Sequence, residues 1–454
     1  MDRQKQPTAL DIPVELIEKT IGAADGFVEL IDNEPAIKRT KAYWHSLGPG
    51  LTTGASDDDP SGIGTYSQAG AQYGFQLLWL SAFTFPLMAV VQEMCARIGL
   101  VTGRGLAGTI RVHFSRRMIY LIALLLLGAN AFNIGADLGA MAKATQLLWP
   151  AAPYVLLVLG FGIFSAALQV LTPYASYAKY LKWLALVLFA YIASALLAHL
   201  DWADVLRHAV VPSISLDKSQ LLLLCAILGT TISPYLFFWQ TSQEVEEAIM
   251  EGRTSIAQRK GTTKQEVRNM RTDVWSGMLL SNLTMFFIIA ACGAVLFAHG
   301  ITNITTASQA AEALRPFAGN ATYFLFAIGI IGTGLLAIPV LAGSTSYAIS
   351  EAAGWREGLY RDFKHAKAFY MVIILAMVIG IAFNFIGLDP IKALIYAAVI
   401  NGIAAPFVLF FIILLSSNKK IMGEWVNKPY ITVIGWATAG LMAAAGIAAI
   451  VSLF

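Results

Sequence analysis

Charged residues are scarce in this sequence, and long apolar runs take their place. Asp, Glu, Lys and Arg make up 13% of the 454 residues, and 57% are hydrophobic. A soluble domain carries about 25% charged residues, so this composition excludes an ordinary soluble protein. Because apolar runs of about 20 residues recur along the chain, the sequence predicts an all-α polytopic membrane protein.

Cysteine and histidine are also few. Cys95, Cys225 and Cys292 lie in apolar segments and form no CxxC pair, which argues against a disulfide framework and a thiolate metal site. The six histidines are scattered, and no two of them have the helical spacing of a metal-binding pair. The apolar segments contain neither a Ser/His pair nor an HExxH motif. We therefore expect a protein that is not an enzyme and has no cofactor.

The first 46 residues are mostly polar and lack the apolar core and cleavage site of a signal peptide. We interpret residues 1–46 as a cytoplasmic tail with a short amphipathic helix that begins near Asp11. Eleven membrane segments are predicted after it, at residues 47–75, 77–100, 118–148, 153–171, 179–199, 219–247, 271–299, 320–349, 368–388, 391–415 and 431–453.

The distribution of basic residues predicts the orientation of these segments. With the N-terminus inside, 26 of the 31 Lys and Arg residues fall in cytoplasmic segments or adjoining helix ends. Such an excess is typical of cytoplasmic loops. We expect a multi-pass protein of the plasma membrane with a cytoplasmic N-terminus and an extracytoplasmic C-terminus. The net charge of +3 gives no reason to expect a nucleic-acid partner.

The first membrane segment cannot be a continuous helix. Its middle contains three consecutive acids, Asp57, Asp58 and Asp59, followed by Pro60 and then Gly62. Proline has no amide hydrogen and clashes with the preceding turn, and glycine lets the backbone leave helical geometry. Because an unpaired backbone group is costly in hydrocarbon, such a break persists only where it lines a cavity. Carboxylates beside the break make that cavity a candidate cation site.

The sixth membrane segment has a second break of the same kind. Residues 229–235 read GTTISPY, and Pro234 interrupts the run near its middle. Segments one and six each open a set of five, so the second set is inserted upside down. We expect one inverted repeat at residues 47–200, another at 219–416 and an eleventh helix at 431–454. Two broken helices at matching positions predict a substrate site near the membrane midplane.

Oxygen atoms dominate the residues at both breaks. The half-helices leave carbonyl oxygens unpaired near Ser56 and Thr230, and Asp59 is the strongest ligand candidate. The neutral hydroxyl candidates are those of Ser61, Thr230, Ser233 and Tyr235. Such a set suits hard ions such as Mg²⁺, Mn²⁺ or Ca²⁺, and Mg²⁺ commonly keeps several waters beside one or two carboxylates.

The neighbours of Asp59 leave two alternatives open. Successive helical residues point about 100° apart, so three consecutive carboxylates cannot all face one ion. In one alternative, Asp57 and Asp58 line the path of the ion and touch the ion or its hydration shell. In the other, they pair with a basic group.

Several stretches resemble the Nramp family of divalent-metal transporters. The similarity is carried by Gly48-Pro49-Gly50, Asp59-Pro60, residues 68–74 (QAGAQYG), Leu77-Leu78-Trp79, residues 96–103 (ARIGLVTG) and Asp137-Leu138. It covers about residues 45–415. The resemblance implies a LeuT-like fold of two inverted five-helix repeats with helices 1 and 6 broken, alternating access, and a divalent metal ion as substrate.

Departures from the family pattern bear on the choice of ion. Where the family has Asp-Pro-Gly-Asn, this chain ends the motif with Ser61-Gly62, so Gly62 stands in the place of the Asn ligand. Where the family has Met-Pro-His, this chain has Ser233 and Tyr235 around the proline, and Gln240 matches a second family histidine.

Further departures concern the proton pathway of the family. Asp137 keeps the family acid of segment three, but Ala140 replaces the glutamate three residues on, and segment nine has no arginine. The pattern resembles that of the Nramp-related magnesium transporters, which are not coupled to protons. The resemblance therefore implies transport that is independent of protons. The family also uses the tenth helix, so Asn401 is a further candidate to reach the ion.

Other polar residues inside the segments have two interpretations. Glu93 is either a functional carboxylate or the partner of Arg97 one helical turn on. Asp137 either lines the ion pathway or pairs with Lys143. Asn401 either reaches the ion site or makes a polar contact between helices.

We interpret Asn130 and Asn133 as packing contacts between helices. The small-residue run AGLMAAAGIAA in residues 439–449 is typical of helix packing or of a dimer face, which fits a monomer or a weak homodimer in the lipid bilayer.

The sequence thus predicts a facilitative transporter that imports Mg²⁺, and also Mn²⁺, by alternating access without protons. The alternative is a proton-coupled Mn²⁺ or Fe²⁺ symporter of the Nramp type. A transporter of organic solutes fits less well, because such a site favours half-helix N-termini around a carboxylate substrate rather than three acids in a row. A metal sensor would need a soluble signalling domain, and only the 46-residue tail is available.

Overall fold

The computed structural model describes residues 43–44, 46–197, 200–215, 217–304, 307–386 and 390–452, and all its regular elements are helices. The chain divides into a unit that ends at Leu47 and a second unit that begins at Gly48. The predicted tail helix near Asp11 lies outside the described residues.

The predicted segments correspond to helices, and apart from the eighth, which begins at Ala307, 13 residues before the predicted 320, their bounds are similar. In chain order these are α3 (Pro49–Asp57) with α4 (Pro60–Tyr73), α5 (Trp79–Thr102), α7 (Arg116–Leu148), α8 (Tyr154–Leu171), α9 (Tyr174–Leu184) with η1 (Ala185–Leu188) and α10 (Phe189–Leu196), α12 (Lys218–Thr231) with α13 (Pro234–Met250), α15 (Lys264–Val295) with η2 (Phe297–His299), α16 (Ala307–Ala353), α17 (Lys367–Phe383), α18 (Pro390–Ser416) and α20 (Pro429–Ser452).

The described residues contain nine helical spans that are long and apolar enough to cross a membrane. The α3–α4 pair and the 17-residue α17 bring the described spans to the predicted eleven. Besides the two broken segments, two further spans deviate from regular helix: η1 interrupts the fifth, and α16 has a non-helical residue at Gly319, where φ is 87°. The predicted start of that segment at residue 320 therefore coincides with the kink.

Short helices connect several spans and were not predicted. They are α6 (Leu106–His113), α11 (Trp202–Val210), α14 (Ile256–Arg259), α19 (Lys419–Met422) and η3 (Gly423–Trp425). Each has too few residues to show the periodicity of an amphipathic helix clearly.

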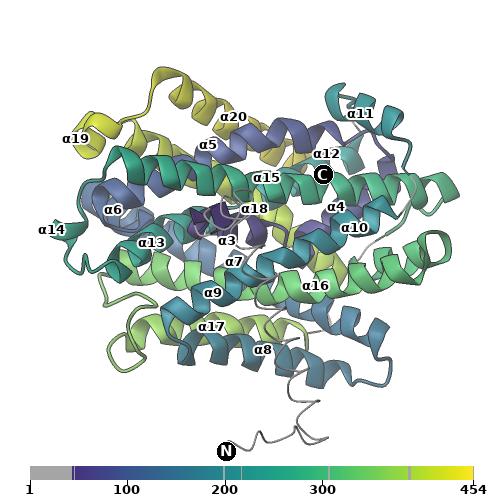
Figure 1. Ribbon diagram of the computed structural model, residues 1–454, viewed down its shortest axis with the longest axis horizontal. Coiled ribbons are helices and arrows are strands. Elements are labelled where there is room, and N and C mark those ends of the chain that lie inside the picture. The colour runs from purple at the N-terminus through teal and green to yellow at the C-terminus, as the bar shows by residue number, and fades with distance from the viewer. Residues whose placement is uncertain are drawn as a thin grey trace, which may run out of the picture. The chain divides into compact units, whose positions relative to one another are not determined.

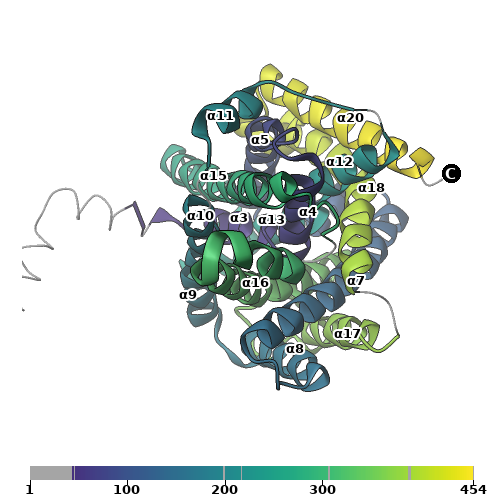
Figure 2. The same ribbon diagram turned by 90° about the vertical axis from the view of Figure 1, so that its right-hand side faces the viewer.

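The broken helix α3–α4 lies in the middle of this unit. Figures 1 and 2 show it between α15 and α16, with α20 at one edge and α8 and α17 at the opposite edge. The half-helix α3 approaches α15 very closely, because a Cβ atom on Gly50 would lie 2.5 Å from the backbone of Val274 and one on Gly54 would lie 2.2 Å from that of Gly277. Glycine at these positions therefore brings the first break into the core.

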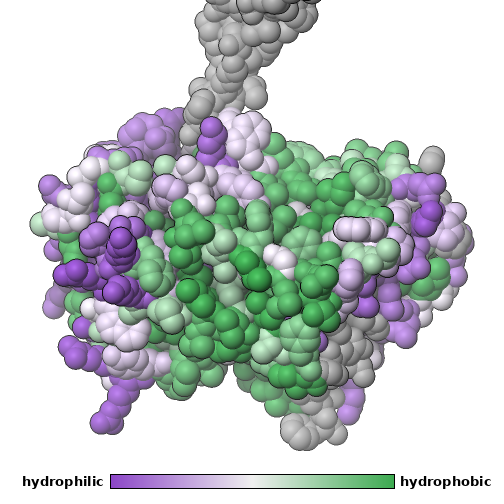
Figure 3. All heavy atoms as spheres, turned by 90° about the horizontal axis from the view of Figure 1, so that it is seen from below, coloured by the Kyte–Doolittle hydropathy of each residue, from purple (hydrophilic) through white to green (hydrophobic). Residues whose placement is uncertain are grey.

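The surface has the pattern expected of a membrane protein. Figure 3 shows a broad hydrophobic region across the middle of one face, with hydrophilic residues gathered toward both ends. The α7 and α8 surfaces contribute strongly exposed side chains such as Leu124, Leu156 and Ile163. Exposure of large apolar side chains over a wide area favours contact with lipid rather than water.

Candidate functional site

The first break spans the three consecutive acids. Helix α3 ends at Asp57, Asp58 follows as its C-terminal cap with φ −86° and ψ 50°, and Asp59 is the extended N-terminal cap of α4. Proline is favourable as the first residue of a helix, so Pro60 starts α4 at the point where it ends the preceding helix. The predicted break at this proline is confirmed.

The second break repeats this arrangement. Helix α12 ends at Thr231, Ile232 is its C-terminal cap, and Ser233 precedes Pro234, the first residue of α13. The hydroxyl of Ser233 donates to the carbonyl oxygens of Gly229 at 2.6 Å and Thr230 at 2.8 Å. The Thr230 carbonyl oxygen, a predicted ligand, thus already accepts one hydrogen bond and keeps one lone pair.

The two breaks meet in space. The hydroxyl of Tyr235 donates to the carbonyl oxygen of Ser56 at 2.8 Å, which closes the end of α3 with a group from α13. A Cβ atom on Gly62 would lie 3.0 Å from Oγ1 of Thr230 and 3.2 Å from the carbonyl oxygen of Asp57. Gly62 therefore allows the close approach of α4 to the second break, and it offers no side-chain ligand.

Asp59 is buried and held in place by three donors. Its Oδ1 accepts hydrogen bonds from the hydroxyl of Ser61 at 2.5 Å and the amide of Gly62 at 2.7 Å. Its Oδ2 accepts one from Nδ2 of Asn133 at 2.7 Å. Asn133 thus makes a contact between helices, as predicted, and its amide also binds the central carboxylate, a role that the sequence did not indicate. A carboxylate has about four acceptor positions, so Asp59 keeps some capacity on Oδ2.

Three further buried carboxylates surround Asp59 but are poorly satisfied. Oδ2 of Asp57 accepts from the hydroxyl of Ser281 at 2.8 Å, whereas its Oδ1 has no hydrogen-bond partner among the described residues. Both carboxylate oxygens of Asp58 and of Asp137 also lack a partner there. All four acids are at most 1% exposed.

No basic residue in the described ranges forms an ion pair with these acids. The alternative pairing of Asp137 with Lys143 is wrong, because the Lys143 side chain is exposed and its Nζ lies 5.1 Å from the ring centroid of Tyr154. Four buried acids thus lie at the breaks without a nearby cationic side chain.

The other polar residues considered from the sequence fall into two groups. Glu93 is structural: Arg97 lies 3.7 Å away, and Arg271 and Trp275 donate to its two oxygens at 2.8 and 3.0 Å. Asn130 is also structural, since its Nδ2 donates to oxygens on α16. Asn401 is buried on α18, which packs against α4 and α12, and its Oδ1 has no partner among the described atoms.

One sulfur atom near the second break was not predicted. The hydroxyl of Thr231 lies 4.0 Å from Sδ of Met285, which α15 brings to the break. Met285 follows Ser281 by one helical turn, so both lie on the same face of α15. The spacing predicts that the two residues share a face of the helix, but it does not predict that this face contacts the breaks.

The carboxylates do not form a closed cage. Among the described residues, no three His, Cys, Asp or Glu side chains are grouped so that they could hold a metal ion. The backbone changes conformation at each of the three consecutive acids: Asp57 ends α3, Asp58 links the two helices, and Asp59 caps the start of α4. Their side chains therefore leave the backbone in different directions. The donors are therefore spread around the breaks, and each is shielded from solvent.

The sequence is similar to those of known proteins over most of its length. The divalent metal cation transporter MntH of Klebsiella pneumoniae is 25% identical over 428 residues, which cover 91% of this chain and 95% of that protein. The MntH of Deinococcus radiodurans is 28% identical over 424 residues, with 88% and 87% coverage.

Solved structures show the same fold. A manganese transporter of Eremococcus coleocola matches with a TM-score of 0.70 and 20% identity, covering 91% of this chain and 87% of the other. Mhp1, a nucleobase-cation-symport-1 family transporter, matches with a TM-score of 0.56 and 14% identity, with 89% and 91% coverage. The family described as natural resistance-associated macrophage protein-like matches residues 50–452, and this protein therefore belongs to the Nramp family of membrane transporters.

Proposed function

We propose that this protein carries divalent metal ions across the membrane, and that the ion passes between the two breaks. The observation that carries this proposal is the group of four buried carboxylates without a cationic partner in the described residues. The metal is the substrate, no resident cofactor is required, and the protein catalyses no chemical reaction.

Burial makes the charge of these carboxylates costly unless a cation balances it. Removing an ionised carboxylate from water costs several kcal/mol unless an opposite charge compensates it, and charged groups inside a membrane bundle occur mainly along ion pathways. A divalent cation near Asp58, Asp59 and Asp137 supplies this compensation. Asn133 orients the carboxylate of Asp59, and the spare lone pairs at Ser56 and Thr230 add partial negative charge.

Mg²⁺ is the substrate that these donors suit best, with Mn²⁺ as a second substrate. The direct candidates at the breaks are oxygens, because Ser233 and Tyr235 occupy the positions of a thioether and an imidazole in the family pattern. The dispersed carboxylates favour an ion that keeps its waters and contacts them through the hydration shell. Mg²⁺ gives up water reluctantly and binds in this manner.

The same substitutions support our proposal that transport is independent of protons. Tyr235 uses its hydroxyl to close the end of α3, and Gln240 donates from Nε2 to Glu244 at 2.9 Å. Neither position holds a group that titrates near neutral pH. We propose inward transport in the plasma membrane, with the N-terminus in the cytoplasm.

Alternating access has to move the half-helices, because the acids are at most 1% exposed. Asp273 on α15 accepts hydrogen bonds from the amides of Gly48, Gly50 and Leu51 at 2.7 to 3.0 Å, and so holds the start of α3. Release of α3 from this carboxylate would open the path on the side that the positive-inside rule assigns to the cytoplasm.

Uptake by purified protein in liposomes tests the proposal, with a Mg²⁺-sensitive dye inside. We expect Asp59→Asn to abolish Mg²⁺ uptake, because an amide keeps the size of the side chain but removes its charge. Asp204→Asn on the exposed helix α11 is the matched control and should keep uptake unchanged. Normal uptake by Asp59→Asn would remove the site, and acidification that follows Mg²⁺ entry would contradict proton independence.

A proton-coupled Mn²⁺ or Fe²⁺ symporter is the second candidate. It is favoured by the unpartnered carboxylate of Asp137 and by the thioether of Met285 near Thr231. Competition separates the two functions: excess Mg²⁺ should block Mn²⁺ uptake if Mg²⁺ is the substrate, and should leave it unchanged in a symporter selective for transition metals.

A further inference from the structure

A polar cavity lies apart from the breaks. It has a volume of about 590 Å³ and is bounded by α6, α13, α14, the end of α16 and the loop after it. Its lining includes no residue of either break. The surrounding basic segments are those that the positive-inside rule assigns to the cytoplasm. A volume of this size is typical of pockets for small-molecule ligands.

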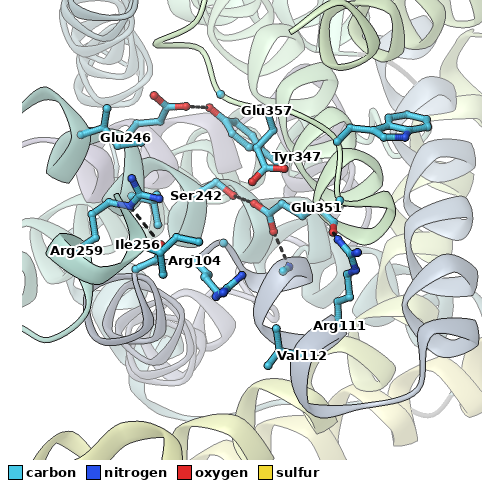
Figure 4. Close-up of a pocket in the computed structure, with 18 of the residues that line it drawn as sticks. Arg104, Arg111, Val112, Ser242, Glu246, Ile256, Arg259, Tyr347, Glu351 and Glu357 are labelled. Atoms are coloured by element: carbon cyan, nitrogen blue, oxygen red, sulfur yellow. Dashed lines mark hydrogen bonds between the residues drawn. The ribbon is translucent and has the colours of Figure 1, made fainter. Parts of the chain in front are cut away.

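Arginine side chains surround this cavity. Figure 4 shows Arg259, Arg104 and Arg111 around the same space, and Arg116 also lines it. Arg111 donates to the carbonyl oxygen of Glu351 at 3.3 Å, and Arg259 donates to backbone oxygens that include Thr254 at 2.7 Å. Within the described chain, no hydrogen bond or ion pair holds the half-buried guanidinium of Arg104.

Two of the three glutamates in the wall are already satisfied. Glu351 accepts from the amide of Gly108 at 2.8 Å and from the hydroxyl of Ser242 at 3.0 Å. Glu246 accepts from the amides of Leu359 and Tyr360 at 2.7 and 3.1 Å, and from the hydroxyl of Tyr347. These carboxylates have their own donors, but they still offset part of the charge of the four arginines that line the cavity.

Glu357 is the remaining acid that faces the arginines. Burial raises the pKa of Glu357 to about 7, against the opposing effect of Arg361, Arg111 and Arg259. At neutral pH this carboxyl group therefore carries only part of a negative charge. With four arginines in its wall, the cavity keeps an excess of positive charge.

We propose that this cavity binds a phosphate-bearing anion from the cytoplasmic side. Guanidinium groups present planar, paired donors that match phosphate oxygens, and Arg104 has its donors available. The volume exceeds what one phosphate needs and leaves room for a larger ligand, such as pyrophosphate or a phosphate ester. Tyr360 and the exposed indole of Trp355 form part of the wall and offer apolar contact to the remainder of the ligand.

The position of the cavity gives the ligand a mechanical role. Arg104 and Arg111 belong to the predicted first repeat, whereas Arg259 and Glu357 belong to the second. A ligand bound to both sets joins the two repeats at their cytoplasmic end. This consequence rests on the proposed transport function, because joined repeats would resist the opening that releases the ion.

Binding to the full-length protein in detergent, measured by calorimetry with pyrophosphate in the presence of EDTA, tests the site without transport. We expect Arg104→Gln to weaken pyrophosphate binding by about tenfold, as for the loss of one charge-assisted contact. Arg207→Gln on α11 removes the same charge from an exposed position outside the cavity and should bind as the wild type does. Absence of pyrophosphate binding, or equal binding by Arg104→Gln, would overturn the proposal.

The source of the phosphate is decided in nanodiscs. If a lipid headgroup fills the cavity, phosphatidylglycerol should suppress pyrophosphate binding to the wild type, relative to phosphatidylcholine. Unchanged binding would assign the site to a free anion. Hydrogen exchange supplies a further readout: pyrophosphate should slow exchange in residues 103–113 and 354–361 together, and slowing of neither would refute the joining of the repeats. Neither measurement depends on transport. A failure of pyrophosphate binding can therefore be distinguished from a failure of Mg²⁺ uptake.

Discussion

The first break and the arginine-lined cavity each contain several buried carboxylates, and the two regions treat them differently. At the cavity, Glu246 and Glu351 each accept hydrogen bonds from donors on neighbouring elements. At the break, Asp58 and Asp137 have no partner among the described residues. Both regions are buried to a similar degree, so burial alone does not mark an ion site. What separates them is whether the fold supplies the donors itself.

Replacement of Asp58 by Asn gives the largest expected effect. Losing one partner of a buried charge costs about 3–5 kcal/mol, which corresponds to a fall in Mg²⁺ affinity of about 100-fold or more. Titration of the purified protein with Mg²⁺ measures this affinity. The same variant should melt at a higher temperature than the wild type without divalent ions, because it removes an uncompensated charge. A lower melting temperature would mean that Asp58 has a stabilising partner and would weaken the comparison.

Replacement of Gly62 by Ala should lower Mg²⁺ uptake by about tenfold, since overpacking costs about 1–3 kcal/mol. The added methyl group would lie 3.0 Å from Oγ1 of Thr230 and push the two breaks apart. Gly128→Ala on α7 is the control, because a Cβ there would meet nothing within 4 Å. Equal uptake by both alanine variants would show that the spacing of the breaks does not matter.

Glu351→Gln tests the other side of the comparison. The substitution weakens the cap that Glu351 places on α6 through Gly108 and should lower the free energy of unfolding by about 1–3 kcal/mol. Mg²⁺ affinity at the breaks should stay within about twofold of the wild type, since separated sites behave additively. A stable variant with lost Mg²⁺ affinity would reverse the roles assigned to the two regions.

The pH dependence of stability probes the cavity wall through Glu357. Its pKa is raised to about 7 in the folded protein, from about 4.3 in an unfolded chain. The contribution of this group to stability is therefore fully present below about pH 4.3 and is lost as the pH rises through about 7. Glu357→Gln should flatten the melting temperature across this window. An unchanged slope would place the titration on another group.

Local rules were sufficient to predict the breaks and most helix bounds. Pro60 and Pro234 end one helix and begin the next through their own covalent geometry, so no knowledge of the partner helices was needed. The Glu93–Arg97 pair also follows from spacing along one helix. These features depend on neighbours in the sequence.

The contacts that define the site depend on neighbours in space. Asn133 reaches Asp59 across 74 positions of the chain, and Ser281 reaches Asp57 across 224. Nothing in the spacing of Asn130 and Asn133 indicates that one packs against α16 and the other binds a carboxylate. The sequence also ranked Asp59 first, whereas Asp58 and Asp137 are the acids that lack donors within the described chain.

Met285→Leu should have the smallest effect and sharpens the choice of ion. The thioether lies 4.0 Å from the hydroxyl of Thr231, and Leu keeps nearly the same volume, a change that cores tolerate well. If Mg²⁺ is held by oxygens and water, its uptake should change less than about twofold, because hard ions gain little from sulfur. Mn²⁺ uptake is the internal control in the same liposomes. Loss of Mn²⁺ uptake alone would place the sulfur in the path of softer ions, and loss of both would mean that Met285 supports the break by packing.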